Sequence, residues 1–231
     1  MAMRQRGEPF FFWFSAALIV IVVAGFSTAA LGRPGGVLAT PIHLHVHGAI
    51  VLSWYLLLAC QSRLIAAAAI EQHKRLGYLS VFLAAAIIII GYLVVRSVLV
   101  RPDGVIAGRP AVYGAMFPVT DIVNFSIAYS LGLLSRARPR AHKRLMLIAA
   151  ILMIDAAMAR LVFGVGLPAP FILLAELALF AALLGYNLVT LRRPHWATLL
   201  GIVLYASAMV AKVNVESLHW WPGLLQTVFM L

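Results

Sequence analysis

Three histidines stand at alternate positions just before a long apolar segment, at His43, His45 and His47. Imidazole is a common ligand of zinc, copper and iron, and it gains or loses a proton near neutral pH. In a helix, His43 and His47 would share one face and His45 would point away. In an extended segment all three rings would share a face. Metal binding and proton transfer are therefore the chemistry to consider, and hydrogen bonding to lipid headgroups is the structural alternative.

The residues around this motif favour the helix. Thr40 and Pro41 form a typical helix start, with Thr as N-cap and Pro in the first turn. Trp54 and Gln61 then follow His47 at intervals of seven, which places them on the same helical face. We predict His43 and His47 as metal ligands, with His45 as a third ligand if the segment is extended. Trp54 and Gln61 are predicted to contact the same metal or cofactor.

Ionisable residues inside apolar segments form a second group. Such residues are costly in a membrane and are functional candidates for that reason. We predict that the acids orient the histidine ligands or relay protons, and that the cations bind an anionic group such as a carboxylate, a phosphate or a haem propionate. The alternative is that acids and bases neutralise one another as buried ion pairs. The six residues are Asp121, Asp155, Glu176, Arg96, Arg160 and Lys212.

His73 and His142 form a third group, because each begins the same four-residue sequence, His-Lys-Arg-Leu. One interpretation is a haem bound by both imidazoles between two repeated halves, which a parallel internal repeat would explain. The other is anchoring at the membrane surface by basic side chains. We favour anchoring, because haem ligands in membranes usually lie within helices and these residues are expected at the ends, on inner loops between spans.

The composition indicates that these groups belong to a membrane protein. Hydrophobic residues make up 64% of the 231 residues and charged residues only 11%, whereas soluble proteins are nearer half and a quarter. A span needs about 20 apolar residues. We therefore predict an all-α membrane bundle of about seven helices forming a single domain. The expected spans are 10–31, 44–69, 76–99, 112–134, 144–165, 169–191 and 196–217.

Lysine and arginine predict the orientation, since they are enriched in cytoplasmic loops. With the N-terminus inside and the C-terminus outside, twelve of the eighteen lie on the inner side, densest between Arg136 and Arg144. The histidine motif and the six intramembrane charges then face outward, which in a bacterial inner membrane is the periplasm. The net charge of +11 is explained by contact with anionic lipid, and no nucleic-acid partner is expected. Cys60 is the sole cysteine, which excludes an internal disulfide.

The order of these motifs resembles a family of bacterial seven-span inner-membrane proteins with His-x-His-Gly, His-Lys-Arg-Leu-Gly and His-Lys-Arg-Leu-Met elements. Here they stand at 45–48, 73–77 and 142–146, and the resemblance covers roughly residues 40 to 190. It implies a topology more than a chemistry. The inner-loop pattern is also similar to a short His-Arg-x-x-Met motif in small membrane proteins linked to maturation of haem-copper oxidases, which favours haem or copper.

We therefore predict an inner-membrane protein with a periplasm-facing polar site that binds haem or a copper, zinc or iron ion. It would act as a redox enzyme or as a cofactor-handling subunit. One alternative is a transporter or proton-coupled carrier that uses the same buried charges. Another is a structural accessory subunit without a site. Lipid is the expected partner in every case, and the subunit interpretations add other membrane proteins.

Overall fold

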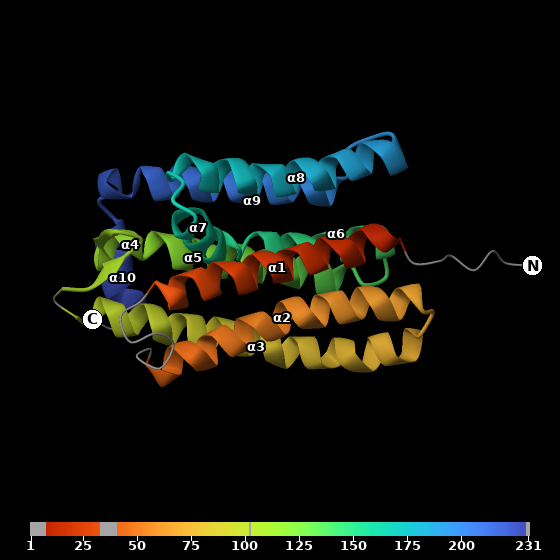
Figure 1. Ribbon diagram of the computed structural model, residues 1–231, viewed down its shortest axis with the longest axis horizontal. Helices are drawn as coiled ribbons and strands as arrows, with labels where there is room; N and C mark the ends of the chain where they lie inside the picture. Colours follow the sequence, from red (N-terminus) through yellow and green to blue (C-terminus); the bar gives the residue numbers. More distant parts are fainter. Residues whose placement is uncertain (1–7, 33–40, 102, 230–231) are drawn as a thin grey trace, which may run out of the picture.

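The computed structural model describes residues 8–32, 41–101 and 103–229, and almost all of them are helical. The long helices lie side by side along one direction (Figure 1). In chain order the elements are α1 (Pro9–Leu31), α2 (Ile42–Ala66), α3 (Ile70–Leu99), β1 (Val105–Ile106), β2 (Arg109–Pro110), α4 (Ala111–Gly114), α5 (Met116–Leu134), α6 (Pro139–Ile151), α7 (Asp155–Gly164), α8 (Pro170–Leu191), α9 (Trp196–Val213), η2 (Val215–Ser217) and α10 (Trp221–Phe229).

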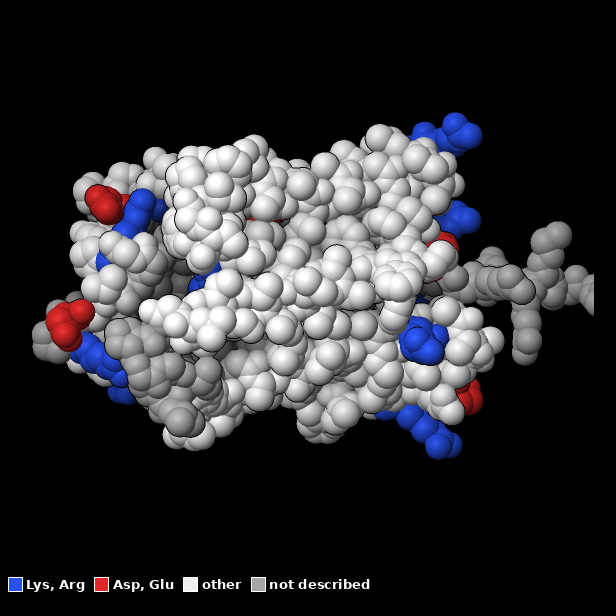
Figure 2. All heavy atoms as spheres, viewed as in Figure 1, with Lys and Arg blue, Asp and Glu red and all other residues white. Residues whose placement is uncertain are grey.

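Six helices of the described chain are long and apolar enough to cross a membrane, and the number is seven if α6 and α7 count together as one bent span. The predicted all-α membrane bundle is thus confirmed. Lys and Arg gather at the two ends of the bundle, and the flank between them is largely uncharged (Figure 2). We call the end with the loop 135–138 the basic end. The end with the two short antiparallel strands and α10 is called the hairpin end.

Two helices begin earlier than the sequence indicated. α3 begins at Ile70 rather than at 76, because 67–69 make a tight turn in which Ala68 has a φ of 56°. α6 begins at Pro139 rather than at 144, since proline fits the first turn of a helix. His73 and His142 are consequently each the fourth residue of a helix. They lie at the helix ends as expected, but in the first helical turn and not on a loop between spans.

The fifth predicted span, 144–165, is not one straight helix. It is broken between Ile151 and Asp155, and its two halves are bent by 48°. A break frees backbone carbonyls that need new partners inside a membrane. The Ala150 carbonyl oxygen accepts a hydrogen bond from the Tyr55 hydroxyl at 3.0 Å, besides one from the Met153 N–H at 3.3 Å. The break also makes Asp155 the first residue of a new helix.

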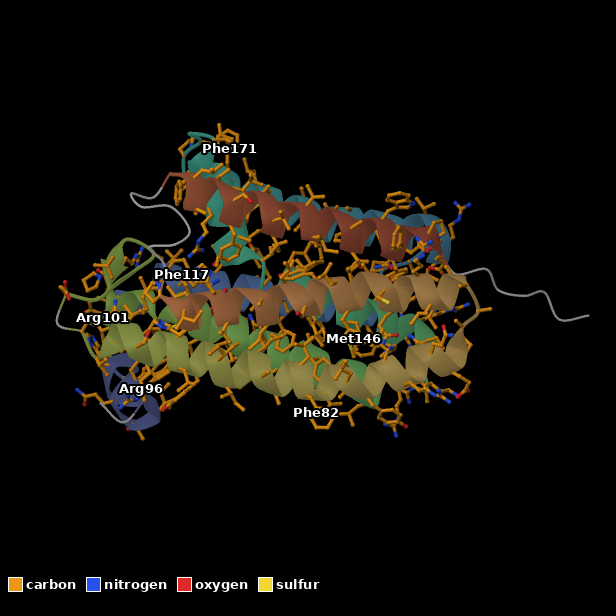
Figure 3. The ribbon with its side chains drawn as sticks, turned by 60° about the horizontal axis from the view of Figure 1, so that its bottom comes forward. Phe82, Arg96, Arg101, Phe117, Met146 and Phe171 are labelled. Atoms are coloured by element: carbon orange, nitrogen blue, oxygen red, sulfur yellow. The ribbon has the colours of Figure 1, made fainter. Side chains whose placement is uncertain are left out.

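The core lies where α1, α2, α5 and α6 meet and includes Leu18, Trp54, Phe125 and Ile148. α1 reaches it by packing closely on α7, since a Cβ on Gly25 would overlap the carbonyl oxygen of Ala157. The leucine and phenylalanine side chains on the outer surface fit a lipid environment. Phe82, for example, is 73% exposed and points away from the bundle (Figure 3).

Polar contacts fasten the helices together at the basic end. Glu8, just before α1, pairs with Lys143 at 2.6 Å and accepts a hydrogen bond from Tyr186. Burial tends to raise the pKa of the Glu8 carboxyl, but the bonds from Lys143 and Tyr186 outweigh it and hold that pKa below its ordinary value. Nearby, the buried Arg144 donates from Nε to Asn187 Oδ1 at 2.6 Å. These contacts join α1, α6 and α8.

Candidate functional site, a buried lysine–carboxylate cluster

Three of the six intramembrane charges meet near the hairpin end. Lys212 Nζ on α9 lies 2.9 Å from Asp121 Oδ1 on α5 and 2.6 Å from Asp155 Oδ2 on α7. The lysine side chain is only 4% exposed, and each aspartate side chain is 16% exposed. Residues 57 and 91 positions apart in the chain therefore form one ion-paired centre.

The local structure stabilises the charged forms of Asp155 and Lys212. Asp155 opens α7, where unpaired backbone N–H groups and the helix dipole favour a carboxylate. Phe117, one turn before Asp121 on α5, places its ring centre 5.2 Å from Lys212 Nζ. An ammonium near an aromatic ring gains a cation–π attraction. The lysine is thus held by two carboxylates and one ring.

A fourth side chain extends the cluster. Glu176 on α8 is 2% exposed and accepts a hydrogen bond at 2.7 Å from the Tyr205 hydroxyl. Tyr205 precedes Lys212 by seven residues, so both lie on the same face of α9. The other carboxyl oxygen of Glu176, Oε1, is buried without a hydrogen-bond partner in the described structure. We refer to Asp121, Asp155, Glu176, Tyr205 and Lys212 as the acid cluster.

The two arginines of the predicted layer have other contacts. Arg96 donates from Nε to the Phe229 carbonyl oxygen at 3.1 Å and thereby caps α10, against which it lies (Figure 3). Arg160 donates to the Ala156 carbonyl oxygen at 2.6 Å and places its guanidinium 4.8 Å from the ring centre of Phe26 on α1. Both arginines therefore contact backbone or aromatic groups of neighbouring helices, and binding of an anionic ligand by either of them stays a prediction.

The histidine motif lies in the first turns of α2, as the helical interpretation requires. Thr40 lies outside the described residues, and Pro41 occupies the N-cap position instead of the first helical position. His43 and His47 thus share a face. Within the described ranges, no three His, Cys, Asp or Glu side chains are placed to hold a metal ion together. A metal bound by His43, His45 and His47 stays a prediction.

The face of α2 that carries His47 contains a line of buried polar atoms. His47 Nδ1, Trp54 Nε1 and Gln61 Oε1 follow one another at intervals of seven, and none has a hydrogen-bond partner in the described structure. Trp54 packs edge-on against Phe125 and Tyr129, with ring centres 5.1 and 5.4 Å away. Buried polar atoms are rarely left unpaired, so water or a ligand is expected along this face.

His73 and His142 lie together at the basic end. Their ring centres are 6.4 Å apart and their planes are nearly perpendicular, at 89°. His142 Nδ1 lies 2.8 Å from the Gly132 carbonyl oxygen, and His73 Nδ1 is buried without a partner in the described structure. The shared His-Lys-Arg-Leu sequence singled out both residues, and the structure places them side by side, whereas the internal repeat stays a prediction. The contact of His142 with Gly132 could not be predicted from the sequence, because Gly132 contributes only its backbone carbonyl.

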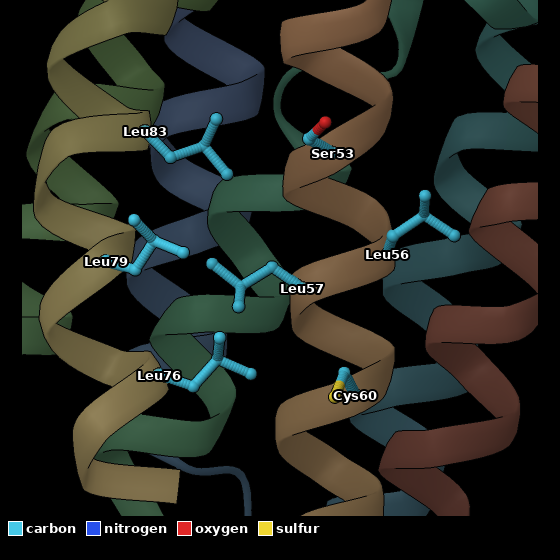
Figure 4. Close-up of a pocket in the computed structure, with 7 residues that line it drawn as sticks. All are labelled: Ser53, Leu56, Leu57, Cys60, Leu76, Leu79 and Leu83. Carbon is cyan, nitrogen blue, oxygen red and sulfur yellow. The ribbon is translucent and has the colours of Figure 1, made fainter. Parts of the chain in front are cut away.

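A hollow of the described structure lies elsewhere, on the outer surface between α2 and α3. This groove of about 510 Å³ is lined by Ser53, Leu56, Leu57, Cys60, Leu76, Leu79 and Leu83 (Figure 4). Leucine from both helices makes it apolar, so an acyl chain of the bilayer fits it better than a polar substrate. The acid cluster and the histidines of α2 take no part in its lining.

Comparison with other proteins adds no further constraint on the activity. No protein-family model, no curated protein and no solved structure matches the chain. The helices identify the chain as an integral membrane protein with a helical bundle.

Proposed function

We propose that the chain is a proton-coupled membrane protein and that the acid cluster is its proton-binding site. The observation that carries this proposal is the ratio of acids to bases. Asp121, Asp155 and Glu176 share one ammonium, Lys212, so full ionisation would leave the cluster with two net negative charges. Uncompensated charge is costly where water is scarce. Binding a proton is the simplest way to remove part of that charge.

The unpartnered oxygen of Glu176 gives the proton a place to bind. Its Oε1 is buried and accepts no hydrogen bond in the described structure, whereas Oε2 already accepts one from Tyr205. A protonated Glu176 could donate from Oε1 to a water or to a transported solute. Glu176 is therefore the carboxyl that we propose to exchange the proton, while Lys212 keeps Asp121 and Asp155 ionised.

The break in the bent span supports a carrier. Secondary transporters commonly bind ions and solutes at discontinuous helices, where helix ends supply charge inside the membrane. Asp155 lies at such a break, and α7 packs tightly against α1 through Gly25. Protonation of a neighbouring carboxyl would weaken the attraction of Lys212 for the cluster and could thereby shift α7 relative to α9.

A redox or metal-binding role near the hairpin end is the second candidate. The observation that favours it is His47 Nδ1, which is buried without a hydrogen-bond partner in the described residues and could bind a metal ion. His43 would be the second ligand. Bound copper, zinc or iron that is lost together in the His43→Ala and His47→Ala variants would favour this candidate over proton coupling.

Infrared difference spectroscopy tests the proton site without knowledge of any solute. We expect the purified protein to show a pH-dependent band of a buried, protonated carboxyl group, and we expect Glu176→Gln to lose it. Glu216→Gln is the matched control, since that side chain is 66% exposed at the hairpin end and forms a surface pair with Arg109. A wild-type protein without such a band across the neutral pH range, or a band unchanged in Glu176→Gln, would overturn the proposal.

A further inference from the structure

We propose that the groove between α2 and α3 binds one anionic phospholipid, with an acyl chain along its leucines and the phosphate group on Arg75. The groove lies on the outer surface of the bundle and is open on that side (Figure 4). The acid cluster and the histidine motif take no part in its lining. The site is therefore independent of the proposed proton-binding carboxyl.

Small side chains on α2 leave room for the acyl chain. Ser53 and Cys60 are seven residues apart, so both lie along one face of that helix. Leu76, Leu79 and Leu83 line the facing wall from α3, at spacings of three and four residues that place them on one face. An acyl chain between the two walls would contact side chains on both sides and would gain more dispersion attraction than on a flat helix surface.

A second hollow, of about 500 Å³, continues the groove toward the basic end. It shares Cys60, Leu76 and Leu79 with the first hollow and adds Leu64, Gln72 and Arg75. The lining thus changes from leucine to polar and charged side chains toward the basic end. An apolar groove that ends at a cation has the same order of groups as a phospholipid, in which an acyl chain ends at a phosphate.

The length of the groove matches one half of a bilayer. At about 1.5 Å per residue, α2 rises roughly 16 Å between Ser53 and Leu64. Half of a hydrocarbon core of about 30 Å is about 15 Å. The groove therefore has the length of an acyl chain in the leaflet at the basic end, and Arg75 lies at the depth of the headgroups.

Arg75 provides the charge that favours an anionic lipid over a neutral one. Within the described part of the chain Arg75 forms no ion pair, whereas its neighbour Lys74 pairs with Glu71 at 3.0 Å. A guanidinium can donate two parallel hydrogen bonds to a phosphate. Gln72, one turn earlier on α3, adds amide N–H donors for a phosphate or ester oxygen. Anionic lipids are enriched in the cytoplasmic leaflet, which is where the basic end is predicted to lie.

A second copy of the chain fits the groove less well than a lipid does. Two copies related by a two-fold axis along the membrane normal would place their Arg75 side chains at the same end of the shared interface. Neither guanidinium has an ion-pair partner in the described ranges, and like charges across an interface repel each other. A phosphate group, in contrast, compensates the charge of Arg75.

Native mass spectrometry of the purified, delipidated full-length protein tests the site. The protein is titrated with phosphatidylglycerol, which is anionic, and with phosphatidylcholine of the same acyl chains, which is zwitterionic. We expect one phosphatidylglycerol to bind per chain in preference to phosphatidylcholine. Arg75→Gln should weaken phosphatidylglycerol binding about fivefold, which is the usual contribution of one basic residue near an anionic lipid surface. Arg75→Lys should retain the preference, because it keeps the charge.

Control variants separate the groove from the rest of the surface. Arg136→Gln is the matched charge control, since Arg136 is exposed at the same end but lies in the loop 135–138, outside the groove. Cys60→Trp fills the groove from an exposed position and should reduce phosphatidylglycerol binding. Val189→Trp is its control, because that side chain is 76% exposed on α8 and should have no such effect.

Three results would overturn the proposal. The first is equal binding of the two lipids by the wild type, and the second is an equal loss in Arg75→Gln and Arg136→Gln. The third is a protein dimer that disappears in Cys60→Trp, which would assign the groove to a second copy of the chain. None of these results bears on the carboxyl band of Glu176, so the two proposals fail independently.

Discussion

Lys212 neutralises two buried aspartates at once, so its loss should be far more harmful than the loss of a surface lysine. Lys212→Met would leave Asp121 and Asp155 without a counter-charge while they are only 16% exposed. Removing one partner of a buried pair typically costs about 3–5 kcal/mol. We expect a loss of this size in the free energy of unfolding, measured by chemical denaturation in detergent micelles.

A surface lysine provides the control for this experiment. Lys74 pairs with Glu71 at 3.0 Å, but its side chain is 60% exposed. Lys74→Met should therefore change the stability by no more than about 1 kcal/mol. The combined variant Lys212→Met, Asp121→Asn, Asp155→Asn should recover much of the loss, because no charge is left unpaired. A triple variant as unstable as Lys212→Met would contradict the ion-pair explanation.

The sequence identified the right residues here but not their pairing. Asp121, Asp155, Glu176 and Lys212 stood out because charge in an apolar segment is rare. Which acid meets the lysine depends on how α5, α7 and α9 pack, and no local pattern encodes that. Arg96 could not be assigned for the same reason, since its partner is a backbone carbonyl of α10, 133 residues away.

At the level of the elements, the contact between α1 and α7 has no tolerance for a larger residue. A Cβ on Gly25 would overlap the Ala157 carbonyl oxygen, which belongs to the backbone and cannot rotate away. Gly25→Ala should therefore separate α1 from the half-span that carries Asp155. We expect a lower thermal unfolding temperature and a weaker Lys212–Asp155 contact, seen as increased exchange in α7 by hydrogen–deuterium mass spectrometry.

Gly185 on α8 is the matched glycine, because a Cβ there meets no atom within 4 Å. Gly185→Ala should be neutral or stabilising, since alanine favours a helix over glycine by about 1 kcal/mol. Equal effects of the two substitutions would show that helix propensity, and not the close approach of α1 to α7, determines the outcome.

Helix limits were predictable wherever hydropathy changes abruptly, as at the start of α9 after Arg192 and Arg193. They were not predictable at α3 and α6, where the basic sequence Lys-Arg looked like a loop although it forms the first turns of a helix. The break at Asp155 could not be predicted either, because neither proline nor glycine occurs between Ile151 and Asp155.

The whole molecule separates two polar groups along its length. The acid cluster lies toward the hairpin end and the paired histidines lie at the basic end, with the aromatic core around Trp54 and Phe125 between them. Groups at opposite ends of one bundle would face opposite sides of the membrane. The side from which the proposed proton site of the acid cluster is reached then depends on which end faces the cytoplasm.

The positive-inside rule predicts that the basic end is cytoplasmic. Single-cysteine labelling tests this in a background that carries Cys60→Ser. His219→Cys places an exposed thiol at the hairpin end, and Ala137→Cys places one in the exposed loop between α5 and α6. In intact spheroplasts, a membrane-impermeant maleimide should label His219→Cys and reach Ala137→Cys only after permeabilisation. The reverse pattern would place the acid cluster toward the cytoplasm and the paired histidines toward the outside.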